Sequence, residues 1–317
     1  MTNSAAAAGK GPFKDAVLSQ EGAEHRHRLR QELQLTLPLT YRRVFRVGKV
    51  HCELYENDRP EAPVILFLAG IGTYCELYAR LLHGLSRQGF HVVGVDLRGH
   101  GYSDGERGVL TVETAVADLS VVIDALETRF TGPFSVYGYS IGATLGASLC
   151  VADERVAALF CTTLLMPEVP PDPLHQIGWH WTRVSAFWFP GLKVPLLQFI
   201  DFKKLIRGVS ADAVDDIEDD PLLVDSYPLK TLSSLFNTPT GLMTIGRTLP
   251  VAIMHGDVDE VLPLSYSERV CASMSQPIEL IRVGDHGHMI PWDNVELNIS
   301  LVAQWMRVHG MGAAGQS

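Results

Sequence analysis

The sequence lacks any hydrophobic stretch long enough to cross a membrane. Its longest apolar runs, such as residues 156–166, fall short of the roughly 18 residues that a membrane-spanning helix needs. The N-terminus, MTNSAAAAGKGPFKD, has no long apolar core of the kind found in secretory signals. We therefore expect no transmembrane segment and a cytoplasmic location.

Cysteines and positive charges are also few. The five cysteines are scattered without a C-x-x-C pair, a pattern typical of reduced, mostly buried thiols. Acidic side chains outnumber basic ones by 36 to 26, and the resulting formal charge of −10 argues against non-specific nucleic-acid binding. Metal-ligand spacing of His and Cys, a P-loop and a dinucleotide-binding glycine motif are all missing. We expect no metal, no cofactor and no nucleic-acid partner.

From residue 41 onward, short apolar runs alternate with helical segments. Residues 41–47 and 49–56 alternate polar and apolar side chains, as half-buried antiparallel strands do. Later runs are nearly all apolar, which is typical of parallel strands covered on both faces. These strand and helix segments are 64–68, 75–88, 92–95, 111–130, 134–137, 157–160, 251–254, 278–283 and 295–309. The alternation predicts an α/β fold with a mostly parallel, doubly wound sheet.

Two segments interrupt this alternation. Residues 1–40 predict an N-terminal extension, mobile to about residue 15 and then carrying a surface helix at 21–35. Residues 167–247 carry no clean strand and predict a helical cap inserted over the carboxyl edge of the sheet, where α/β folds bind ligands. The predicted division is therefore an extension at 1–40, a core at 41–166 and 248–310, a cap at 167–247 and a mobile tail at 311–317.

The pattern G-x-S-x-G at residues 138–142 is the first chemical motif. It directly follows the predicted strand FSVY and precedes a helix of small residues. This strand–turn–helix context is typical of a nucleophile elbow, in which a sharp turn exposes a serine at the start of a helix. We interpret Ser140 as a nucleophile, and the positive end of the helix dipole favours negative charge developing beside it.

A serine hydroxyl needs a base, and the base needs a carboxylate that orients it. After the last predicted strand, His286 and His288 compete, and we favour His288, which follows Gly287 at the end of the loop. After strand VAIM, the carboxylate candidates are Asp257, Asp259 and Glu260, of which we favour Asp259. The chain order of serine, aspartate and histidine is that of α/β hydrolases.

A tetrahedral oxyanion needs two backbone N–H donors. One is expected at Ile141, directly after the nucleophile. The other is expected at Ile71, in the glycine-rich loop 69–72 that follows strand VILFL.

Further motifs give the chain a specific family resemblance. Residues 96–105, DLRGHGYSDG, resemble a stretch typical of the monoacylglycerol lipase and lysophospholipase branch of the α/β-hydrolase superfamily, also labelled the serine aminopeptidase-like hydrolases. The similarity extends over about residues 45–310, including ERG at 106–108, DPL at 220–222 and HGDVDEV at 255–261. It implies an α/β-hydrolase fold with a cap domain and hydrolysis of carboxylic esters, but no particular substrate. One departure is Ala69, which replaces the usual histidine of the oxyanion loop.

The predicted cap is rich in aromatic residues and also carries an acidic run. We expect Trp179, Trp181, Phe187 and Trp188, together with Tyr139, to contribute to an apolar substrate pocket. The alternative is that the aromatic side chains pack the cap onto the core, and the run at 188–200 is also a candidate for contact with a membrane surface. The acidic run at 212–220 is either a solvated segment or a set of carboxylates for a substrate ammonium group.

Together these features predict a serine hydrolase that cleaves carboxylic esters through an acyl-enzyme. The expected partner is a small, apolar ester, and the oligomeric state stays open. The same residues also serve amide, thioester or carbon–carbon cleavage and acyl transfer, which the motifs do not distinguish. A non-catalytic binding module on the same fold is a third reading.

Overall fold

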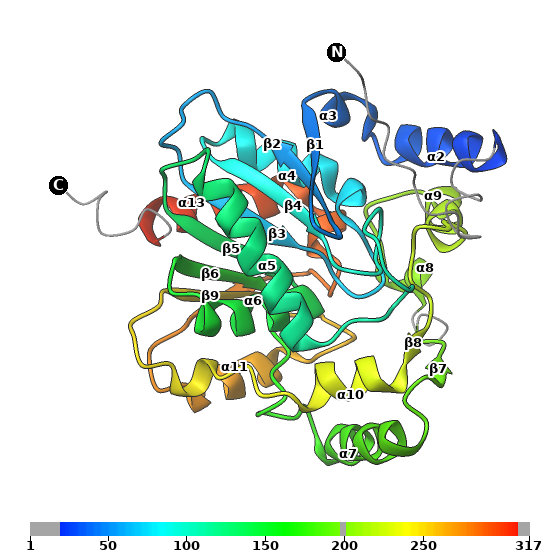
Figure 1. Cartoon of the computed structure of the whole chain (residues 1–317), viewed down its shortest axis with the longest axis vertical. Helices are drawn as coiled ribbons and strands as arrows, with labels where there is room; N and C mark the ends of the chain where they lie inside the picture. Colours follow the sequence, from blue (N-terminus) through cyan, green and yellow to red (C-terminus); the bar gives the residue numbers. More distant parts are fainter. Residues whose placement is uncertain (1–19, 197–200, 310–317) are drawn as a thin grey trace.

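The computed structural model describes residues 20–196 and 201–309, and the segments predicted to be mobile at 1–15 and 311–317 lie outside the described residues. Its centre is a twisted sheet of eight strands in the order β1-β2-β4-β3-β5-β6-β9-β10 (Figure 1). The strands are β1 (Arg42–Val47), β2 (Val50–Tyr55), β3 (Val64–Leu68), β4 (His91–Asp96), β5 (Phe134–Tyr139), β6 (Val156–Thr162), β9 (Val251–Gly256) and β10 (Glu279–Val283).

Strand β2 runs antiparallel to both β1 and β4, whereas the other neighbouring strands are parallel. The predicted mostly parallel α/β sheet is confirmed. One detail was wrong: β2 was expected to be half-buried, yet all of its residues are buried. The reason is that β2 is covered on both faces, with Tyr55 in one apolar cluster and Cys52 and Leu54 in the other. Strand β1, at the edge of the sheet, has only exposed and partly exposed residues.

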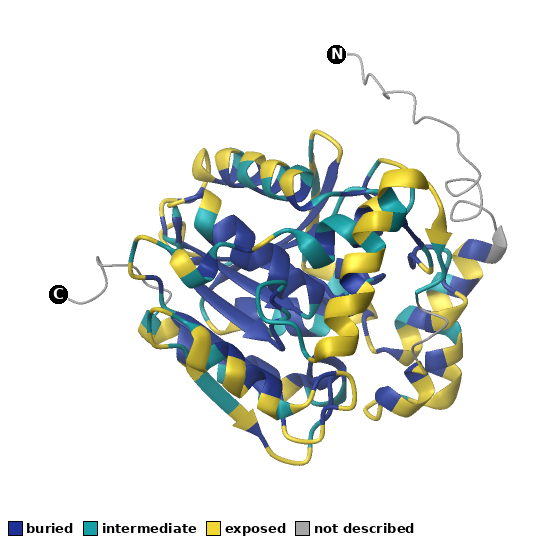
Figure 2. Ribbon diagram, turned by 90° about the horizontal axis from the view of Figure 1, so that it is seen from below, coloured by how far each residue is buried: buried dark blue, intermediate teal, exposed yellow. Residues whose placement is uncertain are grey.

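Helices cover both faces of the sheet. Successive strand residues point to opposite faces, and apolar side chains on both faces need to be buried. Ile65 and Phe67 of β3 join one apolar cluster, and Val64 and Leu66 join the other. Figure 2 shows the resulting buried interior. The helices of the core are η1 (Cys75–Tyr78), α4 (Ala79–Arg87), α5 (Val112–Glu127), α6 (Ile141–Ala152), α11 (Leu264–Ser273), α12 (Ile290–Asp293) and α13 (Val295–His309).

The segment 167–247 is mainly helical and lies beside the core in Figure 1. Its elements are α7 (Pro173–Trp188), β7 (Lys193–Val194), α8 (Phe202–Leu205), α9 (Ala211–Glu218), β8 (Tyr227–Pro228), α10 (Leu229–Asn237) and η3 (Leu242–Thr244). Helix α7 packs on α10 through stacked rings of Trp179 and Phe236, 5.7 Å apart. Although α7 is apolar, no helix in the described part of the chain is long and apolar enough to span a membrane.

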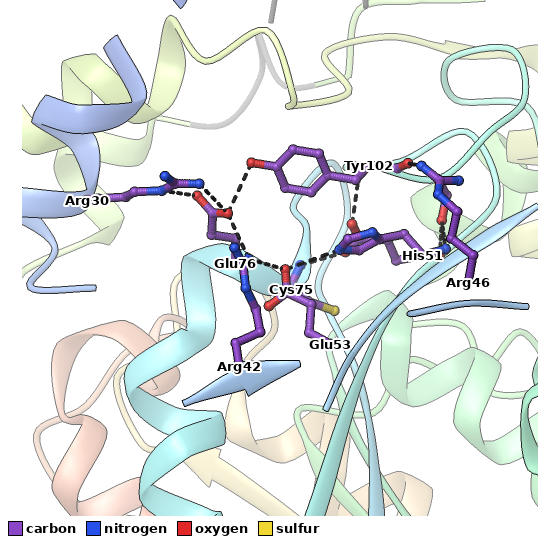
Figure 3. A network of polar contacts seen from close by, with 10 residues as sticks. Arg30, Arg42, Arg46, His51, Glu53, Cys75, Glu76 and Tyr102 are labelled. Atoms are coloured by element: carbon purple, nitrogen blue, oxygen red, sulfur yellow. Dashed lines mark hydrogen bonds and ion pairs between the residues drawn. The ribbon is translucent and has the colours of Figure 1, made fainter. Parts of the chain in front are cut away.

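The N-terminal segment forms α2 (Gln20–Glu32) and α3 (Thr36–Thr40). The predicted surface helix is present, but it is anchored to the core. Arg30 donates two hydrogen bonds to the buried carboxylate of Glu76, at 2.7 and 2.9 Å, and Arg42 joins Glu76 to the equally buried Glu53 (Figure 3). Because a buried carboxylate is strongly destabilising without a partner, these arginines tie the segment to the sheet.

Candidate active site

Ser140 lies on a tight turn between β5 and α6. Its backbone adopts φ 52° and ψ −119°, a strained conformation for a residue with a side chain. The glycines around it permit the turn, since a Cβ added to Gly142 would lie 2.3 Å from the carbonyl oxygen of Leu68, and one on Gly138 would lie 2.4 Å from Cα of Ala143. The strand–turn–helix context expected of the motif is therefore present.

His288 connects Ser140 to Asp259. Its Nε2 lies 3.2 Å from Oγ of Ser140, and its Nδ1 lies 2.8 Å from Oδ2 of Asp259. An ionised carboxylate only accepts hydrogen bonds, so Nδ1 carries the proton and the lone pair of Nε2 faces the serine hydroxyl. This arrangement suits proton transfer from the serine.

Asp259 is held in place from several sides. The N–H groups of Val261 and Leu262 donate to its Oδ1 at 2.8 and 2.9 Å, and the hydroxyl of Thr163 donates to Oδ2 at 3.3 Å. Burial alone raises the pKa of Asp259, but the hydrogen bonds from His288 and Leu262 outweigh it and leave the pKa below its usual value. The side chain is therefore a carboxylate at neutral pH.

The competing candidates from the sequence lie elsewhere. His286 bonds locally, with Nδ1 2.6 Å from the carbonyl oxygen of Gly284. Asp257 is exposed and accepts a hydrogen bond from the N–H of Asp285 at 2.8 Å. Glu260 pairs with Arg207. The structure brings His288 and Asp259, rather than these neighbours, to Ser140.

A cavity opens at Ser140. Its lining includes three further residues predicted to belong to the site: Ile71, Tyr139 and His288. Ile141, the first residue of α6, follows Ser140 directly, and the first N–H groups of a helix have no helical acceptor. The remaining lining is largely apolar: Gly70, Thr73, Tyr78, Phe202, Leu205, Val261 and Met289.

Most aromatic residues of the segment 167–247 lie away from this cavity. Trp181, Phe187 and Trp188 are exposed by 62%, 78% and 70%, and Trp179 packs against Phe236 of α10. The structure does not bring these four side chains to Ser140. The reason is that α7 packs on α10 rather than over the cavity, whose wall comes instead from Phe202 and Leu205 of α8.

The acidic run at 212–220 is folded into α9 and its flank. Asp215 pairs with Lys203 at 2.5 Å, and Asp216 lies 3.6 Å from His25 and 3.7 Å from Arg28. The cavity lining among the described residues includes no member of this run.

Sequence reasoning missed several residues of the site. Thr163 contacts Asp259 from a left-handed backbone conformation, with φ 55°, and nothing local in the sequence marks it. His255 lies fully buried behind Asp259, 3.5 Å from Oδ2. It stands in the recognised run HGDVDEV, which was the available signal. Phe202 and Leu205 lie in the segment 167–247, and the sequence pattern did not show which of its apolar residues would line the cavity.

The sheet, the elbow and this arrangement of side chains define the class of the protein, an α/β hydrolase. More particularly, the chain belongs to the family described as serine aminopeptidase S33, whose family model matches residues 59–293. The resemblance to the monoacylglycerol lipase branch is confirmed.

Similar proteins are spread over several organisms. The AB hydrolase superfamily protein YisY of Bacillus subtilis is 22% identical, over 80% of this chain and 96% of its own. Mouse monoglyceride lipase is 25% identical, over 66% of this chain and 69% of its own. Among solved structures, the monoacylglycerol lipase of Paleococcus ferrophilus has a TM-score of 0.69 at 22% identity, covering 83% of this chain and all of its own. The structural likeness supports the fold.

Proposed function

We propose that the protein is a serine hydrolase that cleaves carboxylic esters with an apolar acyl group. The observation that carries the proposal is the continuous contact from Ser140 through His288 to Asp259, beside a cavity with a largely apolar wall. Membership of a hydrolase family supports the same class of chemistry.

In the proposed reaction, Oγ of Ser140 attacks the ester carbonyl carbon while Nε2 of His288 takes the hydroxyl proton. Asp259 orients the ring and stabilises the imidazolium that forms. The N–H groups of Ile71 and Ile141 bind the oxyanion. His288 then protonates the departing alcohol and leaves an acyl-enzyme. Water attacks this ester and gives its proton to His288. His288 then returns the proton to Oγ of Ser140 as the bond between Oγ and the acyl carbon breaks, which releases the acid.

The apolar acyl group is inferred from the cavity wall. Phe202, Leu205, Val261 and Met289 line the cavity near Ser140, and apolar lining suits a hydrocarbon chain. Amide, thioester or carbon–carbon cleavage and acyl transfer use the same residues and form the alternative to ester hydrolysis.

The domain division belongs to this proposal. Residues 167–247 act as a cap, since α8 supplies part of the cavity wall.

The exposed apolar face of α7 is proposed to touch a lipid surface, although the end of the run at 188–200 lies outside the described residues. All five cysteines are free, which supports a reducing, cytoplasmic setting.

The deciding experiment is hydrolysis of an acyl ladder, from short to long p-nitrophenyl esters and on to monoacylglycerols, by the wild type and Ser140→Ala. We expect activity that rises with chain length in the wild type and is lost in the variant. Full activity in Ser140→Ala would refute the proposed nucleophile. Labelling by a fluorophosphonate without turnover of any ester would shift the assignment to an amide, thioester or carbon–carbon substrate.

A further inference from the structure

The loop that carries Ile71 is held by residues far along the chain. Gly72 adopts a left-handed backbone, with φ 76°. Both of its backbone groups are bonded to the segment 167–247: its N–H donates to Oη of Tyr227 at 2.7 Å, and its carbonyl oxygen accepts from the N–H of Val224 at 2.9 Å. The segment 167–247 therefore fixes the backbone of Gly72, the residue next to Ile71, through two hydrogen bonds.

The peptide on the other side of Ile71 is held within the loop. The carbonyl oxygen of Gly70 accepts from the hydroxyl of Thr73 at 2.8 Å and from its N–H at 3.2 Å. That carbonyl shares a planar peptide with the N–H of Ile71, so bonding one group orients the other. The two peptides flanking Ile71 are thus fixed by different parts of the molecule, one by Thr73 and one by Tyr227.

Tyr227 is itself oriented by a histidine of the core. Nε2 of His100 lies 2.8 Å from Oη of Tyr227, and Nδ1 lies 3.1 Å from the carbonyl oxygen of Arg98. A carbonyl oxygen only accepts, so Nδ1 carries the proton and a neutral His100 accepts at Nε2. Burial of the ring lowers the pKa of His100 to about 4, which keeps it neutral. The hydroxyl of Tyr227 therefore donates to His100 and accepts from Gly72.

From this relay we infer that Tyr227 is a positioning residue for the oxyanion-binding loop, aligning the N–H of Ile71 through Gly72. Tyr227 is 1% exposed and is absent from the cavity lining, so it acts through the loop rather than on the substrate. The inference rests on the proposed function, because it assigns Ile71 a role in binding the oxyanion. It also means that the segment 167–247 stabilises the transition state indirectly, by positioning the oxyanion-binding loop. This effect is separate from any contact of the segment with the acyl group.

Tyr227→Phe tests the inference, since it keeps the ring and removes only the hydroxyl. The matched control is Tyr266→Phe. Tyr266 is also fully buried and, like Tyr227, does not line the cavity. Its hydroxyl also accepts from a backbone N–H, but that N–H belongs to Met166, at 2.8 Å, and not to the loop 69–72. The active fraction of each preparation is titrated with a fluorophosphonate, so that loss of folded protein is separated from loss of rate.

We expect kcat of Tyr227→Phe to fall about tenfold or more on a soluble ester, with KM little changed, because misplacing an oxyanion donor weakens binding of the transition state alone. The inhibition constant of an alkyl trifluoromethyl ketone, which adds to the serine as a tetrahedral oxyanion, should rise by the same factor. Tyr266→Phe should leave both quantities unchanged per active site.

Wild-type kcat and ketone affinity in Tyr227→Phe would overturn the inference, and so would equal losses in Tyr266→Phe. If Tyr227→Phe does not fold, His100→Leu takes its place, because it removes the acceptor of the Tyr227 hydroxyl. It should lower kcat and ketone affinity in the same direction, and wild-type values would again overturn the inference. Ester turnover that persists in Ser140→Ala refutes the proposed function itself, which distinguishes the two failures.

Discussion

Helices α6 and α7 are both apolar, but they use their side chains in opposite ways. In α6, ten consecutive residues from Ile141 to Cys150 are buried. In α7, Trp179 is the buried residue, while Leu174, Ile177, Trp181, Phe187 and Trp188 are each more than half exposed. One helix is locked into the core beneath Ser140, and the other presents its apolar surface outward.

The difference teaches which constraint acts on each helix. Many residues of α6 are small, and Gly146 lets the helix approach the sheet so closely that an added Cβ would lie 2.8 Å from Val136. Such packing fixes the start of α6, and with it Ser140. Helix α7 meets no comparable demand, and a contiguous exposed apolar face is unusual for a surface that contacts only water.

For the buried region around α6 and Ser140, the variant with the largest expected effect is His288→Ala. Removing the proposed base should lower kcat/KM about 10³-fold or more, because the serine hydroxyl then has no proton acceptor. The comparison variant is His286→Ala, two residues away and bonded to its own loop, which should stay near wild type. A larger loss in His286→Ala than in His288→Ala would reverse the assignment. The measurement is hydrolysis of a soluble p-nitrophenyl ester.

Two glycine substitutions compare the packing of the helices directly. Gly142→Ala should lower the free energy of unfolding by about 3 kcal/mol or more, since its Cβ would collide with the backbone of Leu68. Gly178→Ala in α7 meets nothing within 4 Å and should raise stability by about 0.5–1 kcal/mol through helix propensity. Urea unfolding of both variants measures the contrast. Equal effects would mean that α6 is not packed as tightly as described.

The contact between His100 and Tyr227 should show in the pH dependence of stability. Burial lowers the pKa of His100 to about 4 in the fold, against a usual value near 6.5. Above pH 6.5 the His100 ring is neutral in both the folded and the unfolded protein. As the pH falls toward 4, this ring takes up a proton in the unfolded chain but not in the folded protein. This residue should therefore remove about 3 kcal/mol of stability over that interval.

In His100→Gln, the free energy of unfolding should fall less steeply between pH 7 and pH 4 than in the wild type. Urea unfolding at several pH values measures the slope. His27→Gln, on the exposed side of α2, should keep the wild-type slope. An unchanged slope in His100→Gln would show that another group controls acid unfolding.

The exposed apolar face of α7 predicts a smaller effect, a change in binding to lipid vesicles. Trp181→Glu or Phe187→Glu should weaken binding to phosphatidylcholine vesicles about tenfold, because each places a charge where apolar area would enter the lipid. Turnover of a soluble short ester should be unchanged. Val121→Glu on α5, a residue that is 50% exposed, is the matched control and should bind like wild type. Equal vesicle binding by all variants would exclude α7 as the contact face.

Much of the fold was predictable because its signals are local. Continuous apolar runs identified β3, β5 and β9, and the motif at 138–142 identified the turn at Ser140. The choice of His288 over His286 also followed from neighbouring residues. The cavity wall was not predictable in the same way, since Phe202 and Trp181 are both aromatic residues of one segment, and only their packing separates a buried side chain from an exposed one.

By itself, the sequence determined the strands and the turn at Ser140, since each depends on conformational preferences within a few neighbouring positions. It also gave the chain order of Ser140, Asp259 and His288. Tertiary structure decided which residues meet across long separations. Tyr227 contacts Gly72 from 155 positions away, and Thr163 reaches Asp259 from 96. The physical reason is that such contacts depend on how a whole segment packs against the sheet, which no local pattern of residues encodes.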